Sequence, residues 1–267
     1  MSSAILSTGH TQEEMRSIEQ FLGSCTVPLV YQSNGRTFVH GTGTFFQLGQ
    51  YRYLVTAAHI FKDIDPKDLA VPEGPTNTHI WTLGNITIHH PKEQDEFDVA
   101  VVRLEDEDFC SRIAKGWRFL GESNVAPDSL VSTDYIVAGY PTATVEHKPG
   151  CLVPQALMQL YTGPYEGPVD GNRASLDVLL RYSKTAKGVF GDMKPTPDLG
   201  GVSGASIWAV AATPDGLWAP DTMLKIVGVQ VSFKHSSYVR GKSWALVSEI
   251  IRRIATDNET LSEAVSK

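Results

Sequence analysis

Hydrophobic and polar residues alternate along most of the chain, a pattern typical of β-strands with one buried face. Residues 26–48 hold two such runs on either side of Asn34-Gly35, a dipeptide favoured in the tight turn of a β-hairpin. Residues 51–61, "YRYLVTAAHIF", predict a strand that passes into a short helical piece. Further strands are predicted at 79–90, 96–104, 135–141, 151–163, 175–183, 205–212 and 224–233.

A helical period replaces the alternation at the two ends of the chain. Thr11 and Glu14 have the spacing of a capping box and predict a helix from Thr11 to Leu22, ended by Gly23. Residues 243–257 carry apolar side chains at helical spacing, which are Leu246, Val247, Ile250, Ile251 and Ile254. The pattern therefore indicates an all-β chain of two units in tandem, with a helix at each end.

Charge, cysteine content and hydropathy narrow the classes of function. The formal net charge is -7 at pH 7, and the longest basic cluster is Arg252-Arg253, so a nucleic-acid groove is not expected. The three cysteines include no C-x-x-C pair, and we expect no metal and no cofactor. The first residues do not have the pattern of a secretory signal, and no run approaches the about 18 apolar residues of a membrane span. We expect a cytoplasmic protein with free thiols and no membrane contact.

Three residues from separate parts of the chain suggest nucleophilic chemistry. His59 follows an apolar strand in "VTAAHIF", Asp98 stands at the head of the strand "FDVAVVRL", and Ser203 lies in "GGVSGASIW". A serine hydroxyl is a weak nucleophile that needs a neutral imidazole to take its proton and a carboxylate to orient that imidazole. Taken singly, each residue also fits a structural role, as a packed histidine, a turn-capping aspartate or a member of a loose turn.

The glycines around Ser203 predict a site for a negatively charged oxygen. Glycine permits backbone geometry that a larger residue would resist, so the amides of Gly201 and Ser203 can aim into one pocket. Ser206 also follows the glycine-rich region, but it falls inside the next predicted strand. Ser203 is therefore the predicted nucleophile.

In the order His, Asp, Ser, these motifs resemble the trypsin-like, chymotrypsin-fold serine proteases, in the form of bacterial and viral members without disulfides. "HGTGTFF", "YIVAGYP" and "IVGVQVS" are similar to further strands of that family, and the resemblance covers about residues 26–255. It implies two six-stranded antiparallel β-barrels with the catalytic residues in the cleft between them. The first barrel would supply His59 and Asp98, and the second would supply Ser203 and the oxyanion-binding amides of Gly201 and Ser203.

The resemblance also implies how the chain is divided and what it does. The expected parts are an N-terminal helical extension (1–25), a first β-barrel (26–120), a linker (121–134), a second β-barrel (135–242) and a C-terminal helix and tail (243–267). The implied function is hydrolysis of peptide bonds in a protein or peptide substrate through an acyl-enzyme. The alternative is a catalytically weak fold that binds a peptide without turnover.

Val202 departs from the pattern of the digestive members of the family. Those members carry an aspartate just before the nucleophile, and it pairs with the new amino terminus that zymogen cleavage creates. A valine cannot form that ion pair, so we expect no activation by N-terminal clipping. Two alternatives stay open for the turn: it forms on its own, or an activating protein partner orders it.

The substrate preference depends on two segments that resemble the walls of the family's primary pocket, residues 196–201 and 228–236. Asp198 would favour a basic substrate side chain, whereas Gln230 and His235 would favour a polar or acidic one. The alternative is that all three face solvent or core and recognise nothing.

Overall fold

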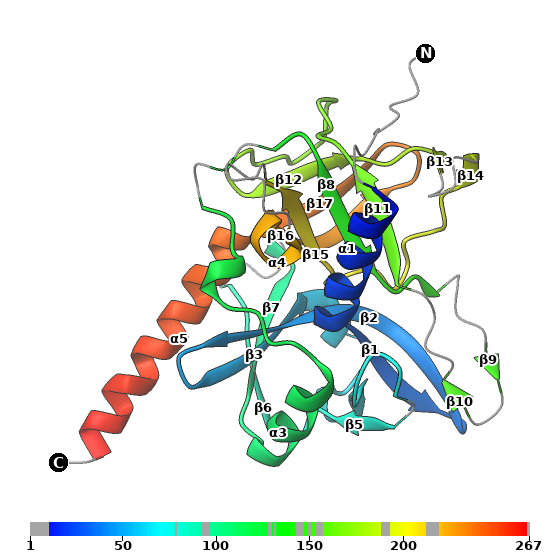
Figure 1. Ribbon diagram of the computed structural model, residues 1–267. Helices are drawn as coiled ribbons and strands as arrows, with labels where there is room; N and C mark the ends of the chain where they lie inside the picture. Colours follow the sequence, from blue (N-terminus) through cyan, green and yellow to red (C-terminus); the bar gives the residue numbers. More distant parts are fainter. Residues whose placement is uncertain are drawn as a thin grey trace.

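Two antiparallel sheets form the body of the protein, each curled into a half-barrel (Figure 1). The computed structural model describes residues 11–62, 64–77, 79–91, 97–127, 130, 132–142, 147–148, 151–152, 157–187, 193–211 and 219–265. The predicted all-β class, with two β units in tandem and a helix at each end, is confirmed.

The first sheet has the strand order β5-β4-β1-β2-β3-β7-β6. Its strands are β1 (Thr26–Ser33), β2 (Arg36–Leu48), β3 (Tyr51–Ala57), β4 (Leu69–Pro72), β5 (Ile80–Thr82), β6 (Ile86–His89) and β7 (Val99–Leu104). The predicted hairpin is present, with Asn34 and Gly35 at φ 50° and 70° between β1 and β2. The sheet has seven strands where six were expected. One difference is that Gly84, at φ 69°, separates β5 from β6 within the predicted strand 79–90.

The second sheet has the strand order β11-β8-β15-β16-β17-β12. Its strands are β8 (Tyr135–Gly139), β11 (Met158–Thr162), β12 (Asp177–Arg181), β15 (Ser206–Val210), β16 (Leu224–Lys234) and β17 (Tyr238–Ser243). Two short pairs lie outside it, β9 (His147–Lys148) with β10 (Cys151–Leu152) and β13 (Thr185–Lys187) with β14 (Met193–Pro195). Ser206 is the first residue of β15, as predicted.

Helices stand near both ends of the chain and between some of the strands. They are α1 (Gln12–Cys25), α3 (Glu107–Gly116), α4 (Pro220–Met223) and α5 (Trp244–Val265), with short 3-10 helices η1 (Ala58–Phe61), η2 (Pro66–Asp68) and η3 (Glu122–Asn124). The predicted capping box of Thr11 and Glu14 is present at the start of α1. The prediction that Gly23 ends this helix is wrong, because the helix continues to Cys25, whose side chain is fully buried. Within the described residues, no helix is both long and apolar enough to span a membrane.

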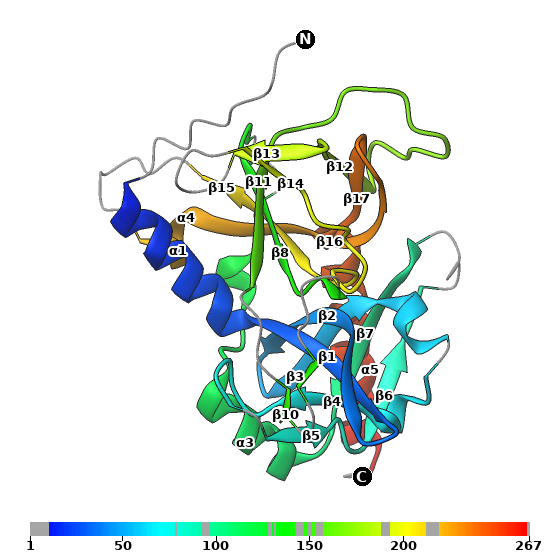
Figure 2. The same ribbon diagram turned by 90° about the vertical axis from the view of Figure 1, so that its right-hand side faces the viewer.

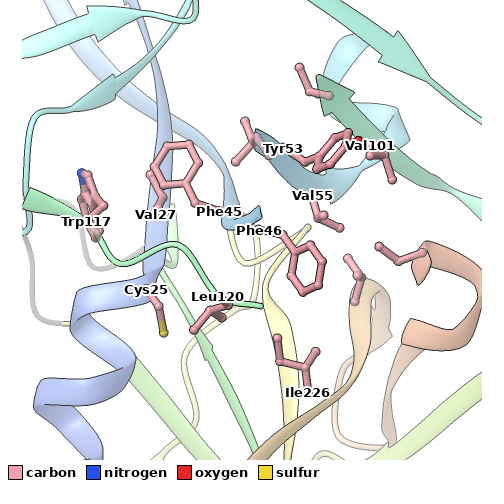
Figure 3. Packing of buried hydrophobic residues seen from close by; sticks show 14 of the residues in the cluster. Cys25, Val27, Phe45, Phe46, Tyr53, Val55, Val101, Trp117, Leu120 and Ile226 are labelled. Carbon is pink, nitrogen blue, oxygen red and sulfur yellow. The ribbon is translucent and has the colours of Figure 1, made fainter. Parts of the chain in front are cut away.

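One buried hydrophobic cluster joins the two sheets. It combines Phe46 of β2 with Ile226 of β16 (Figure 3). Trp208 of β15 belongs to the same cluster. Helix α1 lies beside both sheets in two perpendicular views (Figures 1 and 2). Its Phe21 ring packs edge-on against Trp208, with 5.6 Å between the ring centroids. A second cluster fills the inside of the second sheet. The shared cluster holds the two sheets in one relative position, so residues from both can form a single site.

Candidate active site

The ends of β3 and β7 bring His59 and Asp98 together. The two strands are antiparallel and pair Ala57 with Val99, so the end of one lies beside the start of the other. His59 follows β3 in the single turn of η1, and Asp98 immediately precedes β7. Two residues that are 39 positions apart therefore become neighbours.

Three hydrogen bonds connect Asp98 to the His59 turn. Oδ2 of Asp98 lies 2.7 Å from Nδ1 of His59, Oδ1 accepts from the His59 backbone N–H at 2.8 Å, and the Asp98 carbonyl accepts from the Ala58 N–H at 3.0 Å. A carboxylate can only accept, so Nδ1 donates and Nε2 is left as the basic nitrogen. The side chains of His59 and Asp98 are 39% and 27% exposed, so this pair is accessible to a reactant.

The backbone of Asp98 has a conformation that few residues adopt. Its φ is 45°, in the left-handed region, where aspartate is tolerated better than most side chains other than glycine. The bonds from the backbone N–H groups of Ala58 and His59 hold it there. Such conformations gather at functional sites, where the surrounding structure maintains them.

The turn that carries Ser203 packs against the strands that lead to His59. The Ser203 carbonyl accepts a hydrogen bond from the Thr42 N–H of β2 at 2.8 Å. Gly204, at φ 91°, sits so close to the first sheet that an added Cβ would lie 2.1 Å from both the Thr42 carbonyl oxygen and Oγ1 of Thr56. Thr56 lies three residues before His59. The structure thus places the predicted nucleophile turn from the second sheet on the strand that precedes the predicted base.

The amides predicted to bind an oxyanion occur in this same turn. Gly201 has a φ of 88°, and a Cβ there would lie 2.7 Å from the Tyr140 carbonyl oxygen, so only glycine fits. Within the part of the chain that the structure describes, the N–H groups of Gly201 and Ser203 have no protein acceptor. Two N–H groups of this kind beside a serine hydroxyl are the donors that the predicted oxyanion site requires.

The three residues expected to set specificity lie in different environments. Asp198 is exposed, and its Oδ1 accepts from the Gly200 N–H at 2.8 Å, so this carboxylate supports the turn. Gln230 is fully buried and bonds through its backbone to Gly204 and Ala205, at 2.8 and 2.7 Å. Both polar atoms of the Gln230 amide lack a partner among the described residues. Gln230 therefore combines a place next to the serine turn with unused hydrogen-bonding capacity.

His235 lies in the exposed turn between β16 and β17, and Tyr182 connects it to the rest of the site. The Tyr182 ring meets the rings of His235 and Phe233 edge-on, at 5.6 and 6.0 Å between centroids. The Tyr182 hydroxyl donates to the carbonyl of Pro197, next to Asp198. Sequence reasoning missed Tyr182 because nothing in its local pattern indicates contacts with residues 15 or more positions away.

Among the residues that the structure describes, no group of three or more His, Cys, Asp or Glu side chains could hold an ion.

One of three comparisons with known proteins supports the architecture. A scan against protein-family models found no match, and a search of curated proteins found none either. Among solved structures, a thermostable serine protease, AL20, from an extremophilic microorganism matches with a TM-score of 0.50 and 13% identity, over 83% of this chain and 91% of that chain. The chain has a chymotrypsin-like two-barrel fold. A structure from work on coupled folding and binding of the Sesbania mosaic virus VPg protein also matches, with a TM-score of 0.48 and 16% identity, over 84% of this chain and 87% of that chain.

Proposed function

We propose that this protein is a serine endopeptidase that cleaves peptide bonds in a protein or peptide substrate. The observation that carries the proposal is the bonded pair of His59 and Asp98, with the Ser203 turn packed on the strand that leads to His59. A carboxylate, an imidazole and a serine that act one on the next are the parts that acyl transfer needs.

In the proposed reaction, Oγ of Ser203 attacks the carbonyl carbon of the scissile bond while Nε2 of His59 takes its proton. The N–H groups of Gly201 and Ser203 stabilise the resulting oxyanion. His59 then returns the proton to the leaving amine, and an acyl-enzyme ester forms on Ser203. Water, activated by the same imidazole, hydrolyses the ester and restores the hydroxyl. Asp98 stays ionised and stabilises the imidazolium throughout.

Substrate selection is proposed to involve Gln230. An unpartnered amide next to the serine turn has one acceptor oxygen and two donors. It is fully buried, so a substrate side chain would reach it by displacing the residues that cover it. We expect a preference for cleavage after residues whose side chains form hydrogen bonds. One oxygen of Asp198 accepts from the Gly200 N–H, and the exposed carboxylate keeps its second oxygen for a basic side chain.

A peptide library with mass-spectrometric detection tests the proposal. Wild-type protein should cleave with one dominant preference, Ser203→Ala should abolish cleavage, and Ser206→Ala should leave it intact. Ser206 is a matched control, because it is a buried serine three positions away whose hydroxyl pairs with Thr44 at 2.7 Å. Binding of peptides by wild type without any cleavage would favour the peptide-binding module instead.

A further inference from the structure

The turn that carries Ser203 has no charged anchor at Val202, yet apolar packing holds that residue. The Val202 side chain is fully buried in the cluster inside the second sheet. Its Cγ1 approaches Gly139 of β8 so closely that a Cβ on the glycine would lie 2.8 Å away. A valine in this position is therefore part of the core, and the ion pair of the digestive proteases has no counterpart here.

Each backbone carbonyl of the turn, from Gly200 to Ser203, accepts a hydrogen bond. The Gly200 carbonyl accepts from the N–H and the hydroxyl of Thr142, at 2.7 and 3.1 Å. The Gly201 carbonyl accepts from the Thr42 hydroxyl at 2.8 Å. The Val202 carbonyl accepts from the Ala205 N–H at 2.9 Å, and the Ser203 carbonyl accepts from the Thr42 N–H at 2.8 Å.

These carbonyl contacts determine where the oxyanion-binding amides point. A peptide unit is planar and trans, so its N–H is directed away from its C=O. Holding the Gly200 carbonyl against Thr142 aims the Gly201 N–H to the opposite side, and holding the Val202 carbonyl against Ala205 aims the Ser203 N–H. The Thr42 hydroxyl holds the peptide between these two, whose own N–H, that of Val202, donates to the Leu199 carbonyl, so it fixes the linkage between the two oxyanion-binding amides. A peptide between two glycines, Gly200 and Gly201, otherwise rotates easily, because neither residue restricts φ and ψ strongly.

Thr42 connects the serine turn to the segment that contains Tyr140 and Thr142. Its hydroxyl donates to the Gly201 carbonyl at 2.8 Å and accepts from the Tyr140 N–H at 3.2 Å, so it joins the serine turn to the segment that contains Thr142. Its own carbonyl accepts from the Thr56 hydroxyl at 2.7 Å. The Thr42 side chain is fully buried, so water cannot replace these bonds without a rearrangement.

We propose that Thr42 is a positioning residue that preorganises the oxyanion-binding amides, so that the turn is active without a partner protein. The inference rests on the proposed protease function. Donors already aimed at the developing charge need no reorganisation during the reaction, which is the source of their effect on rate. Thr42 touches neither the substrate nor the reacting atoms in this account, and it acts through Gly201 and Tyr140.

The test compares Thr42→Val, which keeps the shape and removes the hydroxyl, with Thr42→Ser, which keeps the hydroxyl. Thr44→Val is the matched control. Thr44 lies on the same strand, is 1% exposed, and its hydroxyl joins the same two sheets through Ser206, but it has no bond to the turn at 200–203. The measurements are kcat and KM on a peptide ester, the pH profile of kcat/KM, and the thermal unfolding midpoint.

We expect Thr42→Val to lower kcat about 10- to 100-fold, less than the 10²- to 10³-fold loss of a whole oxyanion donor, with KM within about threefold. The pH profile should stay unchanged, because the His59–Asp98 pair is untouched. Thr42→Ser should keep kcat within about threefold of wild type, and Thr44→Val should lower only the unfolding midpoint.

Several results would overturn the inference while leaving the protease function intact. They are a Thr42→Val variant with wild-type kcat, a Thr42→Ser variant as slow as Thr42→Val, or equal losses of kcat in Thr42→Val and Thr44→Val. If Thr42→Val does not fold, Thr42→Cys replaces it, with kcat expected between those of wild type and Thr42→Ala. A wild-type protein that is inert on every ester and forms no fluorophosphonate adduct, both alone and with every candidate partner added, would instead reject the proposed function itself. Full activity that appears only after a second protein is added would reject the inference alone.

Discussion

Replacing Asp98 with asparagine removes the charge of the His59–Asp98 pair and keeps its shape. One Asp98 oxygen accepts from the His59 backbone N–H at 2.8 Å, and the other lies 2.7 Å from Nδ1. Asparagine has only one such oxygen. When that oxygen stays on the backbone N–H, the NH₂ group faces Nδ1, which must then accept a hydrogen bond. The ring proton moves to Nε2, the nitrogen that has to take the proton from Ser203.

The expected loss of kcat in Asp98→Asn follows from this change of tautomer. In the well-studied triad of a serine protease, the same substitution lowers kcat about 10⁴-fold. That factor corresponds to about 5.4 kcal/mol of transition-state stabilisation, at ~1.36 kcal/mol per tenfold change. The folding free energy should change by only about 1 kcal/mol, because one backbone bond is kept and the carboxylate is 27% exposed. KM should stay within about threefold, since uniform substrate binding is unaffected.

Single-turnover hydrolysis of a peptide ester measures the acylation rate, and urea unfolding measures stability in the same samples. Asp106→Asn is the control, because Oδ1 of Asp106 also accepts a backbone N–H, from Phe109 at 2.9 Å, at the start of α3. Asparagine caps a helix about as well as aspartate, so this variant should keep both rate and stability. An Asp98→Asn rate within tenfold of wild type would refute the reasoning, as would an equal loss in Asp106→Asn.

Three further changes test other parts of the structure. Gly204→Ala should unfold at a lower temperature and lose activity, because its Cβ would lie 2.1 Å from the Thr42 carbonyl oxygen and from Oγ1 of Thr56. A melting curve and a rate like those of wild type would contradict this packing. Gln230→Leu should be more stable by about 1 kcal/mol in urea unfolding, since an unpartnered buried amide is removed. The variant should also lose the preference for cleavage after hydrogen-bonding side chains, and an unchanged cleavage profile would exclude the amide from recognition. Burial raises the pKa of the Cys25 thiol to about 12, so iodoacetamide at pH 8 should label this cysteine only after unfolding. Peptide mapping would show the labelled residue, and labelling of Cys25 in the native protein would contradict its burial.

Local patterns predicted the elements whose cause is local. The Asn34-Gly35 turn and the capping box of Thr11 and Glu14 depend on residues within a few positions, and both are present. Helix α3 was missed although Asp106 caps it, because its apolar residues are few and its charged face is long. Strand β17 (Tyr238–Ser243) was missed because its polar sequence has little alternation. It is defined by pairing with β12 and β16, which no local pattern reveals.

The residues of the candidate site also differ in whether a local sequence pattern could predict them. His59, Asp98 and Ser203 could be selected because each lies in a short motif, and the order of the motifs matches a known arrangement. Thr42 could not be selected, because its hydroxyl acts on Gly201, a residue 159 positions away. In the sequence, "HGTGTFF" indicates only a glycine-rich strand. Its contribution to the serine turn becomes visible when the two sheets are packed together.

The most direct test of the central claim is covalent labelling of wild-type protein with a fluorophosphonate, followed by mapping of the modified peptide. A serine activated by a base attacks phosphorus and displaces fluoride, whereas an ordinary serine does not react at a comparable rate. The account predicts one adduct per chain, on Ser203, that forms without any partner protein. It also predicts no adduct in Ser203→Ala and much slower labelling in His59→Ala. A folded wild-type protein that stays unlabelled, or that carries the label on another residue, would contradict it.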